Sequence, residues 1–228
     1  MKKILVIAAH PDDELLGCGG TILNHIDCKD SVDILILAEG ATARYDKRPK
    51  GDDLAANALF DISIEVSKLL GANKPIFGKL YDNRMDSYEF LDIVKIVENV
   101  CNQIKPDIIY THHGGDLNID HQLTHRAVLT ALRPTPNIKF ESLFTFETLS
   151  STEWFPRQQV SQFSPQHFVD ISKYLDKKLE ILNLYKTEIN PFPHARSIEA
   201  VKSLALLRGS NVGLPAAEAF ELVFNIKR

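Results

Sequence analysis

The chain has 228 residues, of which 44% are hydrophobic and 25% are charged, and its formal net charge is −4. These values are typical of a globular domain with a substantial core, and they exclude a disordered chain. The negative net charge argues against binding to the phosphate backbone of nucleic acid, and no apolar run is long enough for a membrane span.

Two further features concern the cellular compartment. Strand-forming residues begin at the amino end and an acidic cluster interrupts them, so no signal peptide is expected. The three cysteines, Cys18, Cys28 and Cys101, form no close pair and predict no disulfide framework. We therefore expect a cytoplasmic protein.

Strands and helices are predicted to alternate over the first 130 residues. Short apolar runs predict strands at residues 4–7, 32–38, 74–80 and 107–111. Apolar side chains at helical spacing predict helices at residues 15–28, 53–71 and 88–104. This alternation is typical of an α/β fold with a Rossmann-like, mostly parallel sheet and helices on both faces.

Beyond residue 133 the pattern is mixed. It predicts a strand at residues 140–147, helices at 174–185 and 198–207 and a closing strand at 219–226, with 154–166 rich in loops. No interdomain linker is recognisable, so we expect a single domain over residues 1–228.

Three glycines, Gly17, Gly19 and Gly20, lie in the body of the first predicted helix. They follow the turn after the strand and lack the G-x-G-x-x-G spacing, so they do not match a dinucleotide-binding fingerprint. Close packing of this helix on the sheet is the expected reason for them.

His10 is placed at the carboxyl end of the first strand, just before a helix whose first position suits Pro11. Asp12, Asp13 and Glu14 follow within one turn, so an imidazole and three carboxylates lie close together. In open α/β sheets this edge is where ligands bind. The alternative interpretation is an ordinary helix start, because acidic residues there complement the helix dipole.

A second cluster, THHGGDLNIDHQLTH, occupies residues 111–125 and begins where the fourth strand is predicted to end. His112 and His113 fall at that strand end, Gly114 and Gly115 make a turn, and Asp120 is expected to cap the next helix. This cluster therefore lies at the same edge of the sheet as the first.

His121 and His125 are four residues apart and share one face of that helix. Their spacing matches the zinc protease motif H-E-x-x-H, but Gln122 stands at the second position and cannot act as a general base. The base must come from elsewhere, and the first cluster offers Asp12. Two clusters of His and Asp at two strand ends are what a metal site requires.

Three segments together resemble a known family. They are AAHPDDE at residues 8–14, N-x-D-H at residues 118–121 and AEAFEL at residues 217–222. The chain resembles the PIG-L/LmbE-like metal-dependent N-deacetylases, which remove acetyl groups from N-acetylglucosamine-type sugars on lipid, thiol-precursor or antibiotic scaffolds. The resemblance implies one LmbE-like deacetylase domain with a three-layer architecture.

By this resemblance, His10, Asp13 and His121 would be the zinc ligands, with Asp12 as the general base. A catalytic zinc takes three protein ligands and keeps a fourth position for water or substrate. Asp12 would accept the proton of the attacking water and then deliver it to the leaving amine. Another divalent ion, such as Fe²⁺, is the alternative to zinc.

The chain departs from the family pattern at Asn118, where many members carry a histidine that is thought to stabilise the oxyanion. An amide donates a hydrogen bond but carries no positive charge. His112 and His113 are the candidates to supply this function, with Asn118 as the weaker donor. For one of the two histidines, a structural hydrogen bond is the alternative.

Substrate contacts are expected from loops at the same edge. The polar loop at residues 39–53 is a candidate lid, with Arg44, Arg48 or Lys50 meeting a phosphate or hydroxyl, or else a solvated loop. Arg84 is the preferred substrate residue outside the metal site, with a surface salt bridge as the alternative. Asp120 is a further candidate substrate-binding residue.

The leading hypothesis is a zinc-dependent hydrolase that removes the N-acetyl group from an N-acetylglucosamine-type sugar or conjugate. The alternatives are a metal-dependent hydrolase of another amide or ester and a non-catalytic Rossmann-like binding protein. The expected partner is a small-molecule sugar substrate; neither nucleic acid nor a membrane is expected, and a homo-oligomer is compatible with the sequence.

Overall fold

The computed structural model describes residues 1–46, 53–135, 138–156 and 162–227. Within them, seven strands form one sheet in the order β3-β2-β1-β4-β5-β7-β6. The strands are β1 (Lys3–Ala8), β2 (Ser31–Ala38), β3 (Ile76–Leu80), β4 (Ile108–His112), β5 (Ser142–Phe146), β6 (His167–Asp170) and β7 (Ala217–Asn225). The helices are α1 (Asp13–Asp27), α2 (Leu54–Leu70), α3 (Phe90–Ile104), α4 (Ile119–Ala131), α5 (Leu175–Leu182) and α6 (Ile198–Ser210).

The strands β1 to β5 run parallel, and β7 pairs antiparallel with both β5 and β6. The predicted α/β fold with a mostly parallel sheet is therefore confirmed. The sequence analysis did not predict β6, because its four residues are too few to show a period and three of them are only partly buried.

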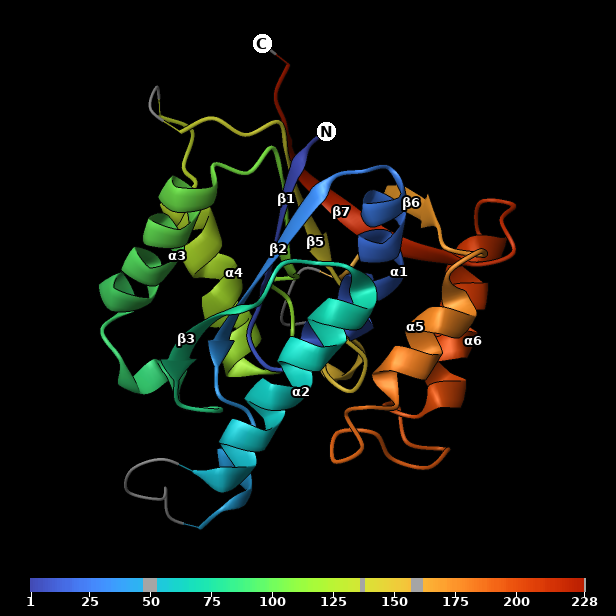
Figure 1. Ribbon diagram of the computed structural model, residues 1–228, viewed down its shortest axis with the longest axis horizontal. Coiled ribbons are helices and arrows are strands. Elements are labelled where there is room, and N and C mark those ends of the chain that lie inside the picture. The colour runs from blue at the N-terminus through green and yellow to red at the C-terminus, as the bar shows by residue number, and fades with distance from the viewer. Residues whose placement is uncertain (47–52, 136–137, 157–161, 228) are drawn as a thin grey trace.

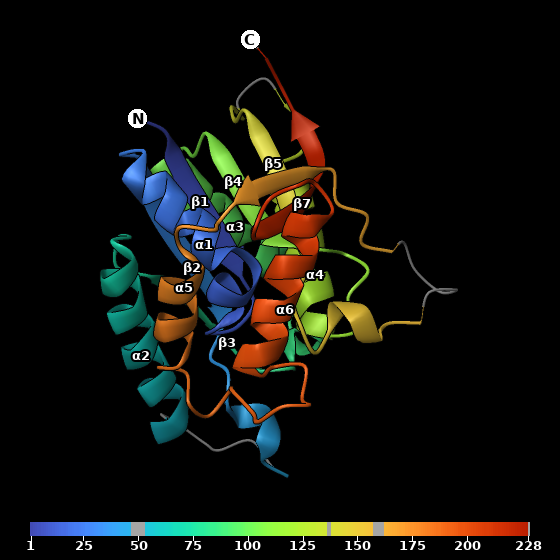
Figure 2. The same ribbon diagram turned by 90° about the vertical axis from the view of Figure 1, so that its right-hand side faces the viewer.

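Helices cover both faces of the sheet and make three layers (Figures 1 and 2). One face carries α3 and α4, and the other carries α1, α2, α5 and α6. Each face has its own apolar core: Ile4 and Val6 point into one, and Leu5 and Ile7 into the other. Since alternate residues of a strand point to opposite faces, burial on both faces explains the unbroken apolar run of β1.

The predicted close packing of the glycines in α1 is confirmed. A Cβ atom at Gly17 would clash with the ring of Phe146 in β5, and one at Gly20 would lie 2.6 Å from a side-chain carbon of Ile171. The absence of side chains at these positions lets α1 lie close to the sheet, which fixes the position of its first turn.

A buried ion pair also holds α1 in place. Lys178 of α5, which is 2% exposed, donates to Glu218 of β7 at 2.7 Å and to the carbonyl of Leu16 at 3.0 Å. Glu218 in turn accepts hydrogen bonds from the N–H groups of Gly20 and Thr21. The pair thus connects the middle of α1 to a strand and a second helix.

Two predictions about helix starts are wrong. Pro11 is not in α1, which begins at Asp13 and has Asp12 as the residue before it. Asp120 does not cap α4: Asn118 is the capping residue, and its side-chain oxygen accepts the N–H of Asp120 at 2.8 Å. Asn118 takes this place because its side chain is short enough to return to the main chain two residues later.

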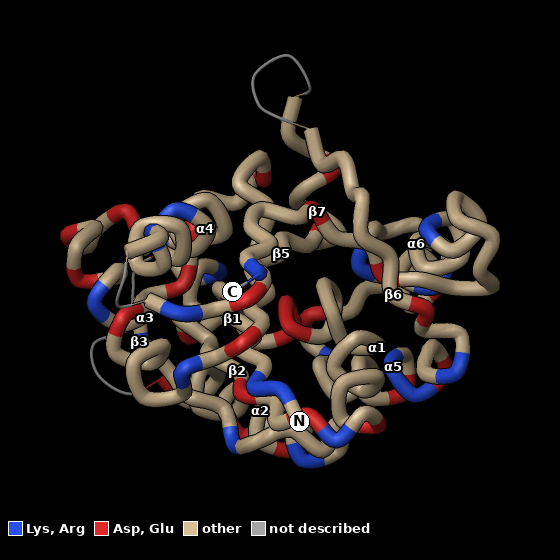
Figure 3. Tube along the Cα trace, turned by 90° about the horizontal axis from the view of Figure 1, so that it is seen from above, with Lys and Arg blue, Asp and Glu red and all other residues tan. Residues whose placement is uncertain are grey.

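Two observations concern the outer surface. Among the described residues, no helix combines the length and the apolar character that a membrane crossing requires. Along the described chain, lysines and arginines are interspersed with acidic residues (Figure 3). Arg48 and Lys50, two of the candidate substrate contacts, lie outside the described residues.

Candidate active site

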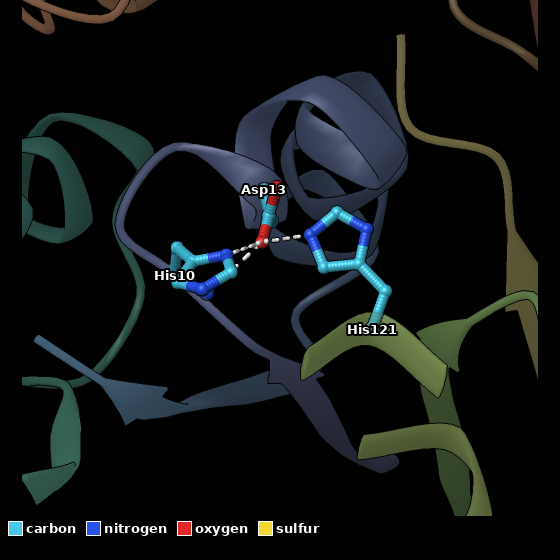
Figure 4. A group of neighbouring side chains, drawn as sticks. All are labelled: His10, Asp13 and His121. Atoms are coloured by element: carbon cyan, nitrogen blue, oxygen red, sulfur yellow. Dashed lines mark hydrogen bonds and ion pairs between the residues drawn. The ribbon is translucent and has the colours of Figure 1, made fainter. Parts of the chain in front are cut away.

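The carboxyl edge of the sheet brings the two histidine clusters together. His10 follows β1 and His112 ends β4, and these two strands are neighbours. His121 lies in the first turn of α4. Figure 4 shows that His10 and Asp13 come from the corner between β1 and α1, while His121 approaches from α4.

Asp13 is at the centre of this group. Its Oδ2 lies 3.3 Å from Nδ1 of His10 and 3.2 Å from Nε2 of His121, and it accepts the main-chain N–H of His10 at 2.9 Å. All three side chains are buried. One donor atom from each of them lies within 4.8 Å of the other two, which is close enough for all three to bind one ion.

Oδ1 of Asp13 has no hydrogen-bond partner among the described residues, and the only polar contact of Nε2 of His121 with those residues is the ion pair with Asp13. A buried polar atom left without a partner costs about 1–3 kcal/mol. Two imidazoles and one carboxylate are a donor set that zinc accepts, and a cation between them would engage both atoms. The residues present therefore fit a zinc-type cation.

The charges in this group shift the pKa values of its members in opposite directions. Burial alone would raise the pKa of Asp13, but the imidazoles of His121 and His112 bring it well below its usual range. Burial alone would lower the pKa of His121, but Asp13 and Asp116 raise it to about 9. The surroundings thus favour a positive charge between the carboxylates, which a bound cation would supply.

Asp116 fixes the orientation of His121. Its Oδ1 lies 3.1 Å from Nδ1 of His121, so that Nε2 faces Asp13. The hydroxyls of Ser151 and Thr152 donate to Asp116, and, despite its burial, His121 and these bonds lower its pKa to about 2. The sequence analysis did not identify Asp116, because nothing in the local pattern marks it as a support for a histidine five residues later.

Asp120 and Asp82 support His10 in a similar way. Oδ2 of Asp120 lies 3.0 Å from Nε2 of His10, and Oδ1 of Asp82 lies 3.4 Å from the same nitrogen. Asp120 also accepts the main-chain N–H groups of Asn83 and Met85, at 2.7 and 3.1 Å. Because both of its oxygens are engaged in this way, these contacts favour an orienting role for Asp120 over contact with substrate.

Asp12 has an unusual main-chain conformation beside this group. Its φ is 102°, in a region that residues other than glycine rarely adopt. Oδ2 accepts from Nη1 of Arg196 at 3.0 Å, whereas Oδ1 is buried and has no partner among the described residues. Burial raises the pKa of Asp12 well above its usual range, against the opposing effect of Arg196.

A cavity of about 270 Å³ opens next to Asp12. Its lining includes His10, Asn118, Arg196 and Arg44, of which Arg44 lies in the short 3₁₀ turn η1 (Thr42–Arg44) after β2. Arg84 precedes the 3₁₀ turn η2 (Met85–Ser87) and is not among the lining residues, although its neighbour Asn83 is. A substrate in this cavity would therefore lie within reach of Asp12 and the two arginines.

His112 and His113 lie outside this lining. Nε2 of His112 accepts the N–H of Ala9 at 2.9 Å, and its Nδ1 lies 3.2 Å from the hydroxyl of Thr148. Burial lowers the pKa of His112 to about 4, which keeps it neutral. Nδ1 of His113 lies 2.7 Å from a carboxylate oxygen of Glu221. Both histidines thus make hydrogen bonds within the protein, whereas the sequence analysis gave this alternative for one of the two.

Arg196 is the functional candidate that the sequence analysis missed. It lies in the loop between α5 and α6, 184 residues beyond the aspartate it contacts. The segment around it contains neither a strand end nor a recognised motif. The packing of α5 against α1, and of α6 against α5 and β7, brings this loop to the carboxyl edge of the sheet (Figure 2).

Comparison with known proteins adds independent findings. The chain is 28% identical over 192 residues to the uncharacterized deacetylase YaiS of Escherichia coli K12, covering 82% of this chain and 91% of that protein. It is 23% identical over 239 residues to the diacetylchitobiose deacetylase of Thermococcus kodakarensis, covering 98% of this chain and 84% of that one.

A solved structure shares the fold with a different chemistry. The chain superposes with a TM-score of 0.76 and 21% identity on GalB, the 4-carboxy-2-hydroxymuconate hydratase of Pseudomonas putida KT2440, over 100% of this chain and 98% of that one. The fold alone therefore does not decide the reaction, and the function must be argued from the site.

The family itself is identified by its description as GlcNAc-PI de-N-acetylase, and it matches residues 5–132, which contain His10, Asp13 and His121. This match covers more than half of the chain. The protein therefore belongs to the PIG-L family.

Proposed function

We propose that this protein is a metal-dependent N-deacetylase that acts on an N-acetylglucosamine-type sugar or sugar conjugate. The observation that carries the proposal is the buried group of His10, Asp13 and His121, which lies beside Asp12. Oδ1 of Asp12 has no hydrogen-bond partner among the described residues and can accept a proton. Membership of the PIG-L family and the similarity to deacetylases support the reaction and the substrate class.

In this proposal, His10, Asp13 and His121 hold a divalent cation, which we take to be zinc. When bound, such an ion supplies Lewis-acid chemistry, because it polarises an amide carbonyl and lowers the pKa of a water molecule. Asp116 and Asp120 keep the two imidazoles aimed at the cation by their hydrogen bonds to the opposite ring nitrogens.

Asp12 moves the proton. Its Oδ1 accepts a proton from the attacking water, and the protonated carboxyl then delivers this proton to the nitrogen of the leaving amine as the C–N bond breaks. Arg196 holds the other oxygen of Asp12 and thus leaves Oδ1 directed away from the ion pair. The products are acetate and a free amino sugar.

A substrate panel tests the proposal. We expect the zinc-loaded protein to release acetate from at least one of N-acetylglucosamine, diacetylchitobiose and N-acetylglucosaminyl conjugates, with activity lost on chelation and restored by zinc. Amides and esters that lack the sugar serve as controls. Release of acid from these controls alone would favour the other hydrolase, and no turnover with tight sugar binding would favour the binding protein.

The assignment of His121, and not His125, as a metal ligand predicts different effects of the two histidines on zinc affinity. His125 is engaged at Nδ1 with the carbonyl of His112 at 2.8 Å, whereas Nε2 of His121 faces Asp13. We expect His121→Ala to weaken zinc binding at least a hundredfold and His125→Ala to weaken it much less, as measured by calorimetry on the metal-free protein. The reverse order would show that the wrong histidine has been chosen.

Arg84 is expected to contribute to substrate binding from the edge of the site. Its Nε is buried without a hydrogen-bond partner among the described residues. Because a lost charge-assisted hydrogen bond costs about 1.5–3 kcal/mol, Arg84→Ala should raise KM roughly tenfold or more without loss of zinc. Unchanged kinetics on the true substrate would remove Arg84 from the binding site.

A further inference from the structure

Arg196 lines the cavity and is held there by several contacts. Its side chain is 18% exposed, Nη1 lies 3.0 Å from Oδ2 of Asp12, and Nε donates to the carbonyl of Leu149 at 3.4 Å. Its main-chain N–H donates to the ring of His194 at 3.0 Å. Among the described residues, none accepts a hydrogen bond from Nη2. A guanidinium fixed on one side therefore keeps donors available in the cavity beside Asp12.

Other donors in the cavity are less well placed. Arg44 has a side chain that is 54% exposed and pairs with Glu188 at 2.6 Å, so it lies at the rim. The side-chain oxygen of Asn118 is tied to the start of α4, and its NH₂ group is a neutral donor. Hydrogen bonds from a charged donor are roughly twice as strong as those from a neutral one. Arg196 is thus the best-placed cation beside Asp12 in the described part of the lining.

We propose that Arg196 is a catalytic residue that stabilises the oxyanion of the deacetylation reaction; this inference rests on the proposed function. The water oxygen forms a bond to the acetyl carbon, and the electron pair of the C=O bond moves to the carbonyl oxygen. Arg196 donates N–H hydrogen bonds to that negative oxygen. When the C=O bond re-forms, the C–N bond breaks and Asp12 gives its proton to the amine.

Such a donor is most valuable when it is in place before the charge develops. The contacts to Asp12 and Leu149 hold the guanidinium in a partly buried site, where electrostatic interactions are stronger than in water. The competing explanation is that Arg196 is only a positioning residue, which acts by orienting Asp12. The two roles differ in what happens to anion binding when the carboxylate of Asp12 is absent.

A tetrahedral inhibitor separates the two roles. The methylphosphonamidate of glucosamine carries a negative charge on phosphoryl oxygens where the intermediate has its oxyanion, whereas N-acetylglucosamine is neutral. In zinc-loaded protein we expect Arg196→Met to weaken binding of the phosphonamidate about a hundredfold and that of N-acetylglucosamine less than threefold, measured by calorimetry. Arg196→Lys, which retains the charge, should lose less affinity for the phosphonamidate than Arg196→Met.

The same comparison in an Asp12→Asn background completes the test. If Arg196 binds the oxyanion, adding Arg196→Met still weakens phosphonamidate binding by at least tenfold; if the effect disappears, Arg196 acts only through Asp12 and the proposal is wrong. If Arg196→Met loses affinity for the phosphonamidate and for N-acetylglucosamine by equal factors, the proposal is also wrong. As a control at the rim, Arg44→Met should change the affinities for the two ligands by similar factors.

Turnover by the wild-type protein distinguishes failure of the oxyanion role from failure of the proposed function. If wild-type protein releases acetate from an N-acetyl sugar but Arg196→Met retains full kcat, the oxyanion role fails and the deacetylase function stands. If wild-type protein hydrolyses no N-acetyl sugar, the proposed function itself fails. We expect wild-type turnover, with kcat reduced about a hundredfold in Arg196→Met and zinc content unchanged.

Discussion

Asp12→Asn is expected to retain zinc and to lower the rate of acetate release by about a hundredfold or more, the usual contribution of a general base. Asparagine preserves the shape of the side chain but cannot accept the proton of the attacking water. Asp12 is the candidate because its Oδ1 is buried without a partner in the described part of the chain and because the residue lines the same cavity as His10. Zinc stoichiometry and acetate release are measured on the same preparation.

The matched variant is Asp13→Asn, one residue further along the chain. Asp13 contacts both His10 and His121, and a neutral amide is a poor ligand for zinc, so this variant should lose metal together with activity. The pair of variants therefore separates the base from the ligand. Loss of zinc in Asp12→Asn with retention in Asp13→Asn would reverse the two assignments.

The buried ion pair between Lys178 and Glu218 is expected to have the largest effect on stability. Lys178→Met leaves a carboxylate that is 5% exposed without its cation, and removing one partner of a buried pair typically costs about 3–5 kcal/mol. Glu218 keeps its hydrogen bonds from the N–H groups of Gly20 and Thr21, so the cost should lie at the lower end of this range. We expect a loss of about 3 kcal/mol in the free energy of unfolding, measured by urea denaturation at pH 7.

A double variant provides the control for this prediction. Lys178→Met combined with Glu218→Gln removes the unpaired charge and keeps an acceptor oxygen for one of the two N–H groups, which bind separate oxygens of Glu218 in the wild-type protein. The double variant should therefore be more stable than Lys178→Met alone, by about 1–2 kcal/mol. If the double variant is less stable than the single one, loss of packing by the lysine side chain, and not the unpaired charge, causes the defect.

The sequence predicted the central sheet well because its signals are local. The strand β1 is an apolar run buried on both faces, and α2 begins at the capping residue Asp53 and ends at Gly71, as expected. Neighbouring parallel strands end at one edge, so the placement of His10 and His112 followed from topology alone. This is why two segments a hundred residues apart could be expected to meet.

The remainder of the site depends on contacts that leave no local signal. Arg196 reaches Asp12 from a loop between two helices whose docking cannot be deduced from periodicity. Asp116 and Asp82 support the histidines, but a carboxylate that binds a buried imidazole has the same sequence appearance as one in a solvated turn. Similarly, the sequence could not show that Asn118, and not Asp120, begins α4, since both residue types serve as helix caps.

The main-chain conformation of Asp12 has a consequence for protein engineering. A residue other than glycine at φ 102° holds about 1–3 kcal/mol of strain, which glycine would relieve. Asp12→Gly would relieve this strain, but it would also leave Arg196 without its carboxylate partner and remove the group that we propose transfers the proton. The two effects on stability oppose each other, so a screen for melting temperature says nothing about activity at this position. Directed evolution of a more robust catalyst must therefore select for turnover in every round.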